Sequence, residues 1–308
     1  MLFRHACRRA VVPGLLAVSL AVTASTAGAQ TTFEDIIRQQ GPATVRGYLQ
    51  PLADILAANL NVGFYHSALI PKSKFGFSLE LVGMGSQVKD AQRVYTAPTP
   101  RGFNPPSFET ATIFGGTGKT VTHANNPSLQ YRGSDGFIET DLFPTGAPQL
   151  RVGGIFGTEV VFRYLSSSVL GLKGSDFPEL KVIGYGLRHS ISQYFNGLPV
   201  DIAVSFFDSD VTWGDIVDME AMTFGAQVGK SVGPLSVHGG LAQESGKMKL
   251  SYTSTSPSAP GAASVDVDVK GQTRFSAGAM LKLGPLQLFG DGNFGKVTTF
   301  SGGLRIGT

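Results

Sequence analysis

The sequence predicts an all-β fold: a transmembrane antiparallel β-barrel of about 12 strands, within a range of about 10–14, preceded by a helical segment. Three observations predict it. The chain opens with an export signal, the remainder alternates between apolar and small or polar residues, and after the signal no run of 18 apolar residues could form a transmembrane helix.

Residues 1–29 have the features of a secretory signal peptide. Arg4, Arg8 and Arg9 give a basic start without an acidic residue, a short apolar run follows, and Ala27-Gly28-Ala29 provides an A-x-A cleavage site. The apolar run is too short for a bilayer-spanning helix, which needs about 20 residues. We therefore expect export from the cytoplasm and cleavage after Ala29.

Cleavage changes the charge and the cysteine content. Removing 29 of 308 residues leaves 279, and the loss of three arginines lowers Lys+Arg from 25 to 22, which equals the 22 Asp+Glu. A neutral mature chain gives no electrostatic reason to expect a nucleic-acid partner. The only cysteine, Cys7, leaves with the signal, so we expect neither disulfides nor thiolate chemistry in the mature protein.

The alternation is clearest in residues 183–192. One face carries Ile183, Tyr185, Leu187, His189 and Ile191, and the other carries Gly184, Gly186, Arg188, Ser190 and Ser192. The same period recurs in residues 158–165, 200–207, 222–229 and 274–283. Such a pattern fits either a soluble sandwich or a transmembrane barrel. Small residues on the second face and strands of about 9–11 residues or more favour the barrel.

Turn lengths favour the barrel as well. Tight turns are expected at Gly197-Leu198-Pro199, Gly233-Pro234 and Gly284-Pro285, and longer outer loops at 208–219 and 245–270. Short periplasmic turns that alternate with longer outer loops are typical of outer-membrane barrels.

A proline-rich loop interrupts the series of expected strands. Residues 86–110 hold Pro98, Pro100, Pro105 and Pro106 and indicate a long loop. The break at Phe156-Gly157 is compatible with a hairpin or with a kink. The twelve expected strands are 74–85, 108–123, 130–143, 148–155, 158–167, 178–195, 200–208, 219–232, 235–250, 266–283, 286–292 and 297–307.

A helical segment, residues 30–62, is expected before the barrel domain, residues 63–308. Its apolar residues follow helical spacing, and Pro51 should kink the helix or start a second one. The segment either covers one end of the barrel or enters the lumen as a plug. The expected plug-helix residues are Tyr48, Leu49, Leu52 and Leu56.

Five charged residues fall on polar faces of the expected strands: Glu159, Arg163, Arg188, Arg274 and Lys282. Exposure of such charges to lipid is costly, so they are expected to line the lumen. Two interpretations remain open: a structural ion-pair network that fills a closed lumen, and a lining that selects cargo.

No catalytic, metal or cofactor site is expected. Residues 115–120 lack the first glycine of a phosphate-binding loop, because Ile113 stands there. The four histidines of the mature chain have no metal-ligand spacing, and His189 and Ser190 point to opposite faces of one strand. The acidic residues within 208–220, and Asp266 and Asp268, carry the oxygen ligands that Ca²⁺ prefers, but the lack of a full calcium-loop pattern favours a solvated outer loop.

Several segments resemble a bacterial outer-membrane family of unknown function. They are Tyr48–Ala53, Ala58–Ala68, Thr112–Gly115, Gly157–Val160, Arg163–Leu165, Gly186–Tyr194, Leu198–Ile202 and Phe289–Lys296. The resemblance covers nearly all of the mature chain, and at fold level that family is similar to barrels that transport long-chain fatty acids and other hydrophobic compounds. It implies transport only by analogy. The Ser/Pro/Ala-rich residues 253–264 and the non-aromatic C-terminus depart from the pattern.

The expected function is therefore a bacterial outer-membrane barrel that passively passes a small hydrophobic molecule. The alternative is a structural or surface-interaction barrel with a filled lumen, and an outer-membrane phospholipase is a further, less favoured alternative. We expect no enzyme activity. The expected partners are outer-membrane lipid, the barrel-assembly machinery and a small hydrophobic ligand.

Overall fold

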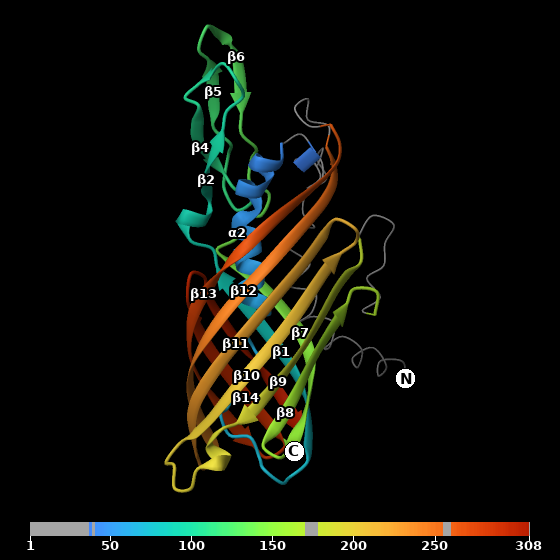
Figure 1. Cartoon of the computed structure of the whole chain (residues 1–308), viewed down its shortest axis with the longest axis vertical. Coiled ribbons are helices and arrows are strands. Elements are labelled where there is room, and N and C mark those ends of the chain that lie inside the picture. Colours follow the sequence, from blue (N-terminus) through green and yellow to red (C-terminus); the bar gives the residue numbers. More distant parts are fainter. Residues whose placement is uncertain (1–36, 39–40, 170–177, 255–259, 308) are drawn as a thin grey trace, which may run out of the picture.

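The computed structural model describes residues 37–38, 41–169, 178–254 and 260–307. Within them, ten antiparallel strands form a closed barrel in the order β1-β15-β14-β13-β12-β11-β10-β9-β8-β7, and β1 closes the ring by pairing with both β7 and β15 (Figure 1). The all-β barrel is confirmed. The barrel has ten strands and not the expected number of about 12, at the lower limit of the expected range of 10–14. The expected signal peptide, residues 1–29, lies outside the described residues.

The barrel strands are long and mostly alternate between buried and exposed residues, as β11 does along its whole length. They are β1 Gly76–Gln87, β7 Leu142–Ile155, β8 Thr158–Ser166, β9 Leu180–Ser190, β10 Asp201–Trp213, β11 Val217–Val232, β12 Leu235–Ser254, β13 Gly261–Leu283, β14 Leu286–Phe294 and β15 Thr298–Gly307.

The two surplus strands belong to a protrusion at one end of the barrel. Residues 88–141 contain η2 Asp90–Gln92 and two small sheets, which pair β2 Val94–Pro98 with β4 Ser107–Ala111, and β3 Phe103–Asn104 with β5 Thr120–His123 and β6 Asn126–Arg132. The expected strands 108–123 and 130–143 fall largely here. These strands have seven residues at most, fewer than the about 9–11 that a strand needs to cross a bilayer, and β6 is exposed at nearly every position.

The two ends of the barrel differ. At the turn end, tight connections such as Phe156-Gly157 join the strands; both residues have positive φ, 52° and 63°, so this break is a hairpin and not a kink. At the loop end lies the protrusion. The expected outer loops 208–219 and 245–270 are instead mostly strand, because β10–β13 extend beyond the apolar zone, where charges can face outward. One such pair joins Lys247 Nζ to Asp266 Oδ2 at 2.8 Å.

The polarity of the barrel is inverted relative to a water-soluble protein. On β1, Phe77 and Leu79 point outward and are 59% and 62% exposed, whereas Glu80 points inward and is 1% exposed. On β8, Phe162 is 45% exposed and Arg163 is fully buried. Large apolar side chains therefore cover the outside, and charged side chains such as Glu80 and Arg163 point into the lumen.

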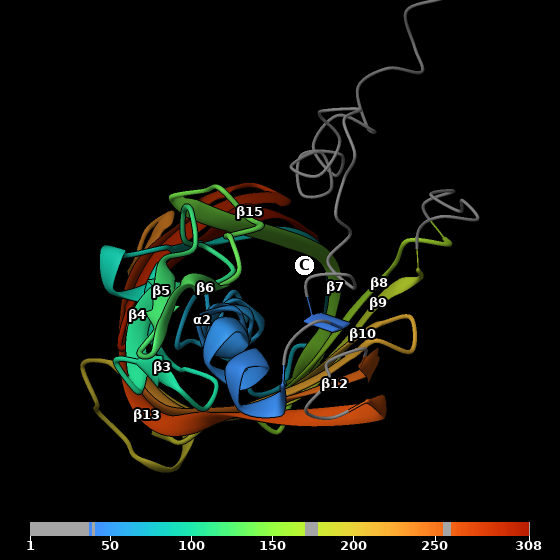
Figure 2. The same cartoon turned by 90° about the horizontal axis from the view of Figure 1, so that it is seen from above.

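Helix α2 Pro42–Leu60 lies inside the ring of strands (Figure 2). Pro42 lies in the first turn of α2, where backbone N–H groups have no partner within the helix, so the N–H that proline lacks costs no hydrogen bond. The helix continues through Pro51 as one element. Its apolar side packs against inward-facing residues such as Met219, Met248 and Val267. From Asn61 the chain runs down the lumen to the turn end, where β1 begins (Figure 1).

Among the described residues, no helix combines the length and apolar character needed to cross a membrane.

Candidate functional site

The candidate site is the occupied lumen. We call residues 42–70, which comprise α2 and the extended chain after it, the lumen segment. Its extended part has no sheet partner, so its backbone oxygens need donors from elsewhere. The barrel wall supplies these donors, and the resulting contacts fix how the segment lies in the lumen.

Wall side chains donate hydrogen bonds to five consecutive carbonyls of the lumen segment. Arg163 reaches two of them, Leu60 O at 3.3 Å and Val62 O at 2.8 Å. The others are Arg274 Nη2 to Asn61 O at 3.0 Å, Gln149 Nε2 to Gly63 O at 2.9 Å and Arg151 Nη2 to Phe64 O at 2.9 Å. Arg188 adds a bond to Ser67 O. We call these five donors, Gln149, Arg151, Arg163, Arg188 and Arg274, the carbonyl clasp.

Acidic side chains on neighbouring strands neutralise the arginines. Arg151 on β7 lies between two carboxylates, with Nε 2.8 Å from Glu80 Oε1 and Nη1 2.5 Å from Glu159 Oε1. Glu159 and Arg188 face each other across β8 and β9 and pair at 2.7 Å. All four side chains are buried. Buried charges are tolerated only when paired, and each of these four side chains takes part in an ion pair.

A second network occupies the opposite wall. Arg274 Nε pairs with Glu244 Oε2 at 2.9 Å, and Gln272 Nε2 donates to the other oxygen of the same carboxylate at 2.8 Å. Arg274 also donates to Asn293 Oδ1 and to Asn61 O. The lumen segment is thus held from both sides by arginines whose orientation is fixed by their own ion pairs and hydrogen bonds.

Aromatic side chains of the lumen segment fill the space between the polar networks. The Phe64 ring is stacked on Phe207 with centroids 4.1 Å apart, and the Arg163 guanidinium carbon lies 3.9 Å from the Phe64 centroid. A Cβ on Gly186 would lie 1.8 Å from the Phe207 ring, so glycine is needed at this wall position. The His66 ring is stacked on Phe289 at 3.5 Å.

The helical half of the segment is held mainly by apolar packing. Tyr48, Leu49 and Leu52 are buried, and the partly buried Leu56 packs against the same cluster. Polar contacts lie at its edges: Tyr48 donates to Asp135 O at 3.0 Å, and Lys296 Nζ lies 2.6 Å from Asp54 Oδ2.

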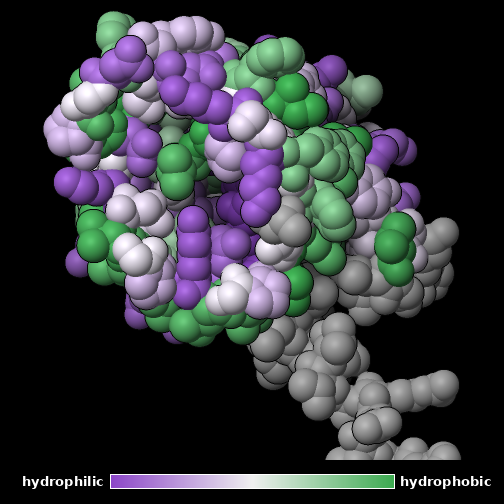
Figure 3. All heavy atoms as spheres, turned by 90° about the horizontal axis from the view of Figure 1, so that it is seen from below, coloured by the Kyte–Doolittle hydropathy of each residue, from purple (hydrophilic) through white to green (hydrophobic). Residues whose placement is uncertain are grey.

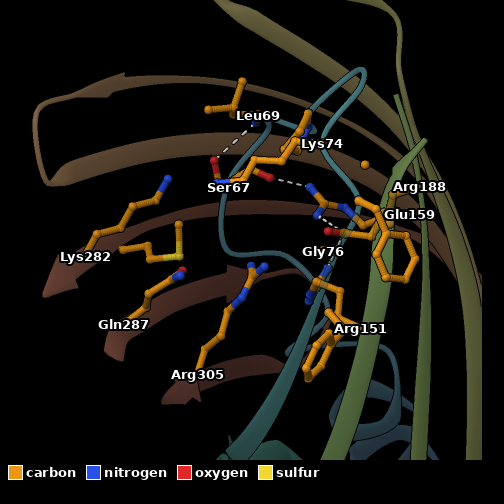
Figure 4. A pocket seen from close by; sticks show the side chains of 16 residues that line it. Ser67, Leu69, Lys74, Gly76, Arg151, Glu159, Arg188, Lys282, Gln287 and Arg305 are labelled. Carbon is orange, nitrogen blue, oxygen red and sulfur yellow. Dashed lines mark hydrogen bonds and ion pairs between the residues drawn. The ribbon is translucent and has the colours of Figure 1, made fainter. Parts of the chain in front are cut away.

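A pocket of about 210 Å³ opens at the turn end, below the clasp. Figure 3 shows this end as a hollow lined by hydrophilic residues, and Figure 4 shows Arg151, Arg188, Lys282 and Arg305 around it. Five cations line the pocket, Lys74 included, against the single lining carboxylate of Glu159. Among the described residues, neither Lys282 nor Lys74 forms an ion pair.

The structure places the five expected lumen residues in three settings. Glu159, Arg163 and Arg188 lie on the neighbouring strands β8 and β9, Arg274 belongs to the second network on the opposite wall, and Lys282 stands apart at the pocket. Sequence reasoning missed Gln149, Arg151, Arg305, Glu80 and Glu244. Strand alternation could have identified them, because each is a polar residue at an inward position of an alternating strand.

His189 lies outside the barrel, near the turn end. Its Nδ1 contacts Thr158 Oγ1 at 2.8 Å and its Nε2 contacts the Tyr194 hydroxyl at 2.9 Å. Ser190 does not share these contacts, as expected from its opposite direction. Among the described residues, no group of three or more His, Cys, Asp or Glu side chains is arranged to hold a metal ion.

The fold and the lumen together define a class: a closed ten-stranded antiparallel β-barrel, apolar outside, whose lumen is occupied by its own N-terminal segment. The chain belongs to a family of unknown function (DUF6588), whose model matches residues 9–308. No functionally curated protein matches the sequence.

Among solved structures, the chain is similar to a loop L8 deletion mutant of the outer membrane protein OmpT of Vibrio cholerae, at 10% identity and a TM-score of 0.30, covering 76% of this chain and 99% of that one. It is similar to the translocator domain of the autotransporter NalP of Neisseria meningitidis, at 11% identity and 0.31, covering 77% and 88%. It is also similar to the toluene transporter TbuX of Ralstonia pickettii, at 10% identity and 0.28, covering 89% and 96%. Likeness at this level carries no information about cargo.

Proposed function

We propose that the protein is a bacterial outer-membrane channel that its own lumen segment closes, and that a small hydrophobic molecule passes when this segment moves. The observation that carries the proposal is the carbonyl clasp. Five consecutive backbone oxygens matched by wall donors support a specific seat for the segment inside the barrel, as a gate requires.

The membrane setting is supported by the inverted polarity. Apolar side chains such as Phe77, Leu79 and Phe162 point outward, as they do where lipid is the solvent. In this setting the turn end faces the periplasm and the protrusion faces the outside, because outer-membrane barrels have short periplasmic turns. The outer membrane and its lipid are therefore the proposed location and partner, and the barrel-assembly machinery the proposed route to it.

The proposal that the cargo is hydrophobic is based on the residues that line the lumen near the loop end. There α2 packs on inward-facing Val211, Met219, Met248 and Val267, so a displaced helix would leave an apolar passage. In the other half, Arg151, Arg188 and Arg274 are paired with carboxylates, which lowers the cost of bringing an apolar solute past them.

A second candidate is a structural or surface-interaction barrel that never opens. The filled lumen and the two small sheets of residues 88–141 favour it, since outer loops can carry function by themselves. The two candidates differ in one property: whether the lumen segment must move.

An engineered disulfide distinguishes them. A Cβ built on Gly246 lies 3.1 Å from Ala57 Cβ, so Ala57→Cys with Gly246→Cys would join the lumen segment to β12. The mature chain has no cysteine of its own. We expect cells expressing this variant to take up a small hydrophobic fluorescent probe when reduced and to lose that uptake when oxidised.

The control is the single variant Gly246→Cys, treated with the same oxidant and reductant. Uptake that is equal in the oxidised and reduced double variant would overturn gating by the lumen segment. Uptake that never exceeds that of cells lacking the protein would favour the closed structural barrel.

A further inference from the structure

The pocket at the turn end has a charge excess that the lumen network leaves uncompensated. Its lining holds Lys74, Arg151, Arg188, Lys282 and Arg305 against Glu159. Including Glu80, which is buried behind Arg151, two carboxylates face five cations. Glu80 and Glu159 are already engaged by Arg151 and Arg188.

Two of these arginines keep a donor without a hydrogen-bond partner. Arg305 Nε is buried without a hydrogen-bond partner, and its distance to Glu80 Oε1 is 3.6 Å, too long for a hydrogen bond. Arg188 is 2% exposed and its Nε also lacks a partner. Buried donors without acceptors are costly, and both arginines belong to the lining of a cavity in which cations outnumber carboxylates.

We propose that this pocket is a binding site for an oxyanion group, a carboxylate or a phosphate, on the periplasmic side of the barrel. Arg305 on β15 and Lys282 on β13 approach from one side, and Arg188 on β9 from the other (Figure 4). Guanidinium and ammonium donors around one cavity match the several acceptor oxygens of such a group. A volume of about 210 Å³ admits the group together with a few waters.

Apolar atoms line the same pocket. Met280 is buried at its wall, and Leu69 and Phe75 are at its edge. The shared chemistry is the oxyanion, which could be a free ion or the headgroup of an amphiphile whose apolar part contacts these residues. The site requires no movement of the lumen segment, so it stands independently of the channel.

Calorimetric titration of the mature protein in a non-ionic detergent tests the site, with inorganic phosphate and hexyl phosphate as the two probes. We expect both to bind. Lys282→Gln should weaken each by about fivefold, because it removes one charged donor that has no other partner. The matched control is Lys230→Gln, an exposed lysine near the same end, which should leave binding unchanged.

Hexyl phosphate binding clearly tighter than phosphate would support an amphiphile, and equal binding would support a free anion. Absence of binding to the unmodified protein, or equal weakening by Lys282→Gln and Lys230→Gln, would overturn the site. The oxidised Ala57→Cys/Gly246→Cys protein should bind as well as the reduced one. If gating by the lumen segment is disproved, the anion-binding result therefore still stands. If anion binding is disproved, the gating proposal is unaffected.

Discussion

Arg163 joins the barrel wall to Phe64 in two ways. Its guanidinium carbon lies 3.9 Å from the Phe64 ring centroid, and its nitrogens donate to the carbonyls of Leu60 and Val62, on the same stretch of chain. One buried side chain on β8 thus fixes both the backbone and an aromatic ring of the lumen segment.

Replacing Arg163 should make the lumen segment more mobile without unfolding the barrel. Arg163→Ala leaves two buried carbonyls without donors and removes the cation from the Phe64 ring, at a cost of about 3 kcal/mol. We expect faster amide hydrogen exchange in residues 60–67 and unchanged exchange in β10 and β11. Arg163→Lys should restore little of the protection from exchange, because one ammonium cannot replace the several N–H donors of the planar guanidinium. The exposed Arg132→Ala is the control, and equal exchange in both variants would contradict the clasp.

Neutralising Glu159, whose carboxylate lies between two arginines, should lower the stability of the barrel more than replacing Arg163 does. Glu159→Gln leaves Arg151 and Arg188 buried with one fewer anion between them, and removing one partner of a buried pair typically costs about 3–5 kcal/mol. The urea midpoint, followed by heat-modifiable gel mobility, should fall clearly. Glu139→Gln, at an exposed residue of the protrusion, should leave it unchanged. An unchanged midpoint for Glu159→Gln would mean that the network does not stabilise the fold.

Two glycines should respond differently to an added methyl group. A Cβ at Gly186 would lie 1.8 Å from the Phe207 ring, whereas a Cβ at Gly83 would find its nearest atom 3.8 Å away. Gly186→Ala should destabilise the barrel by about 1–3 kcal/mol through overpacking, and Gly83→Ala should be neutral or slightly stabilising. Equal urea midpoints for the two variants would show that Phe207 is not seated against Gly186.

The proposed orientation in the membrane can be tested with single cysteines, since residues 30–308 contain none. Gly116→Cys lies in the protrusion, where an added Cβ meets nothing within 4 Å, and Asn196→Cys lies in an exposed turn at the other end. A membrane-impermeant maleimide should label Gly116→Cys in intact cells, and Asn196→Cys only after the outer membrane is permeabilised. The reverse pattern would invert the proposed orientation.

Most barrel strands could be predicted because their alternation is local. The inward position of Arg188 and the outward position of Leu187 follow from strand parity, and the expected strand 178–195 contains β9. Residues 108–143 were misassigned because their β-character is equally strong locally. Only their partners decide that they form separate small sheets and not part of the barrel wall.

The sequence by itself determined the all-β fold, the face on which each charge of an alternating strand lies, and the apolar spacing of Tyr48, Leu49 and Leu52, because these properties depend on neighbours within a few residues. Only the tertiary structure decided that ten strands close the ring, that α2 enters the lumen, and that Arg163 and Arg274 hold it from opposite walls. Those contacts join residues about 100 to 200 positions apart in the chain, and no local pattern encodes which distant donor meets which carbonyl.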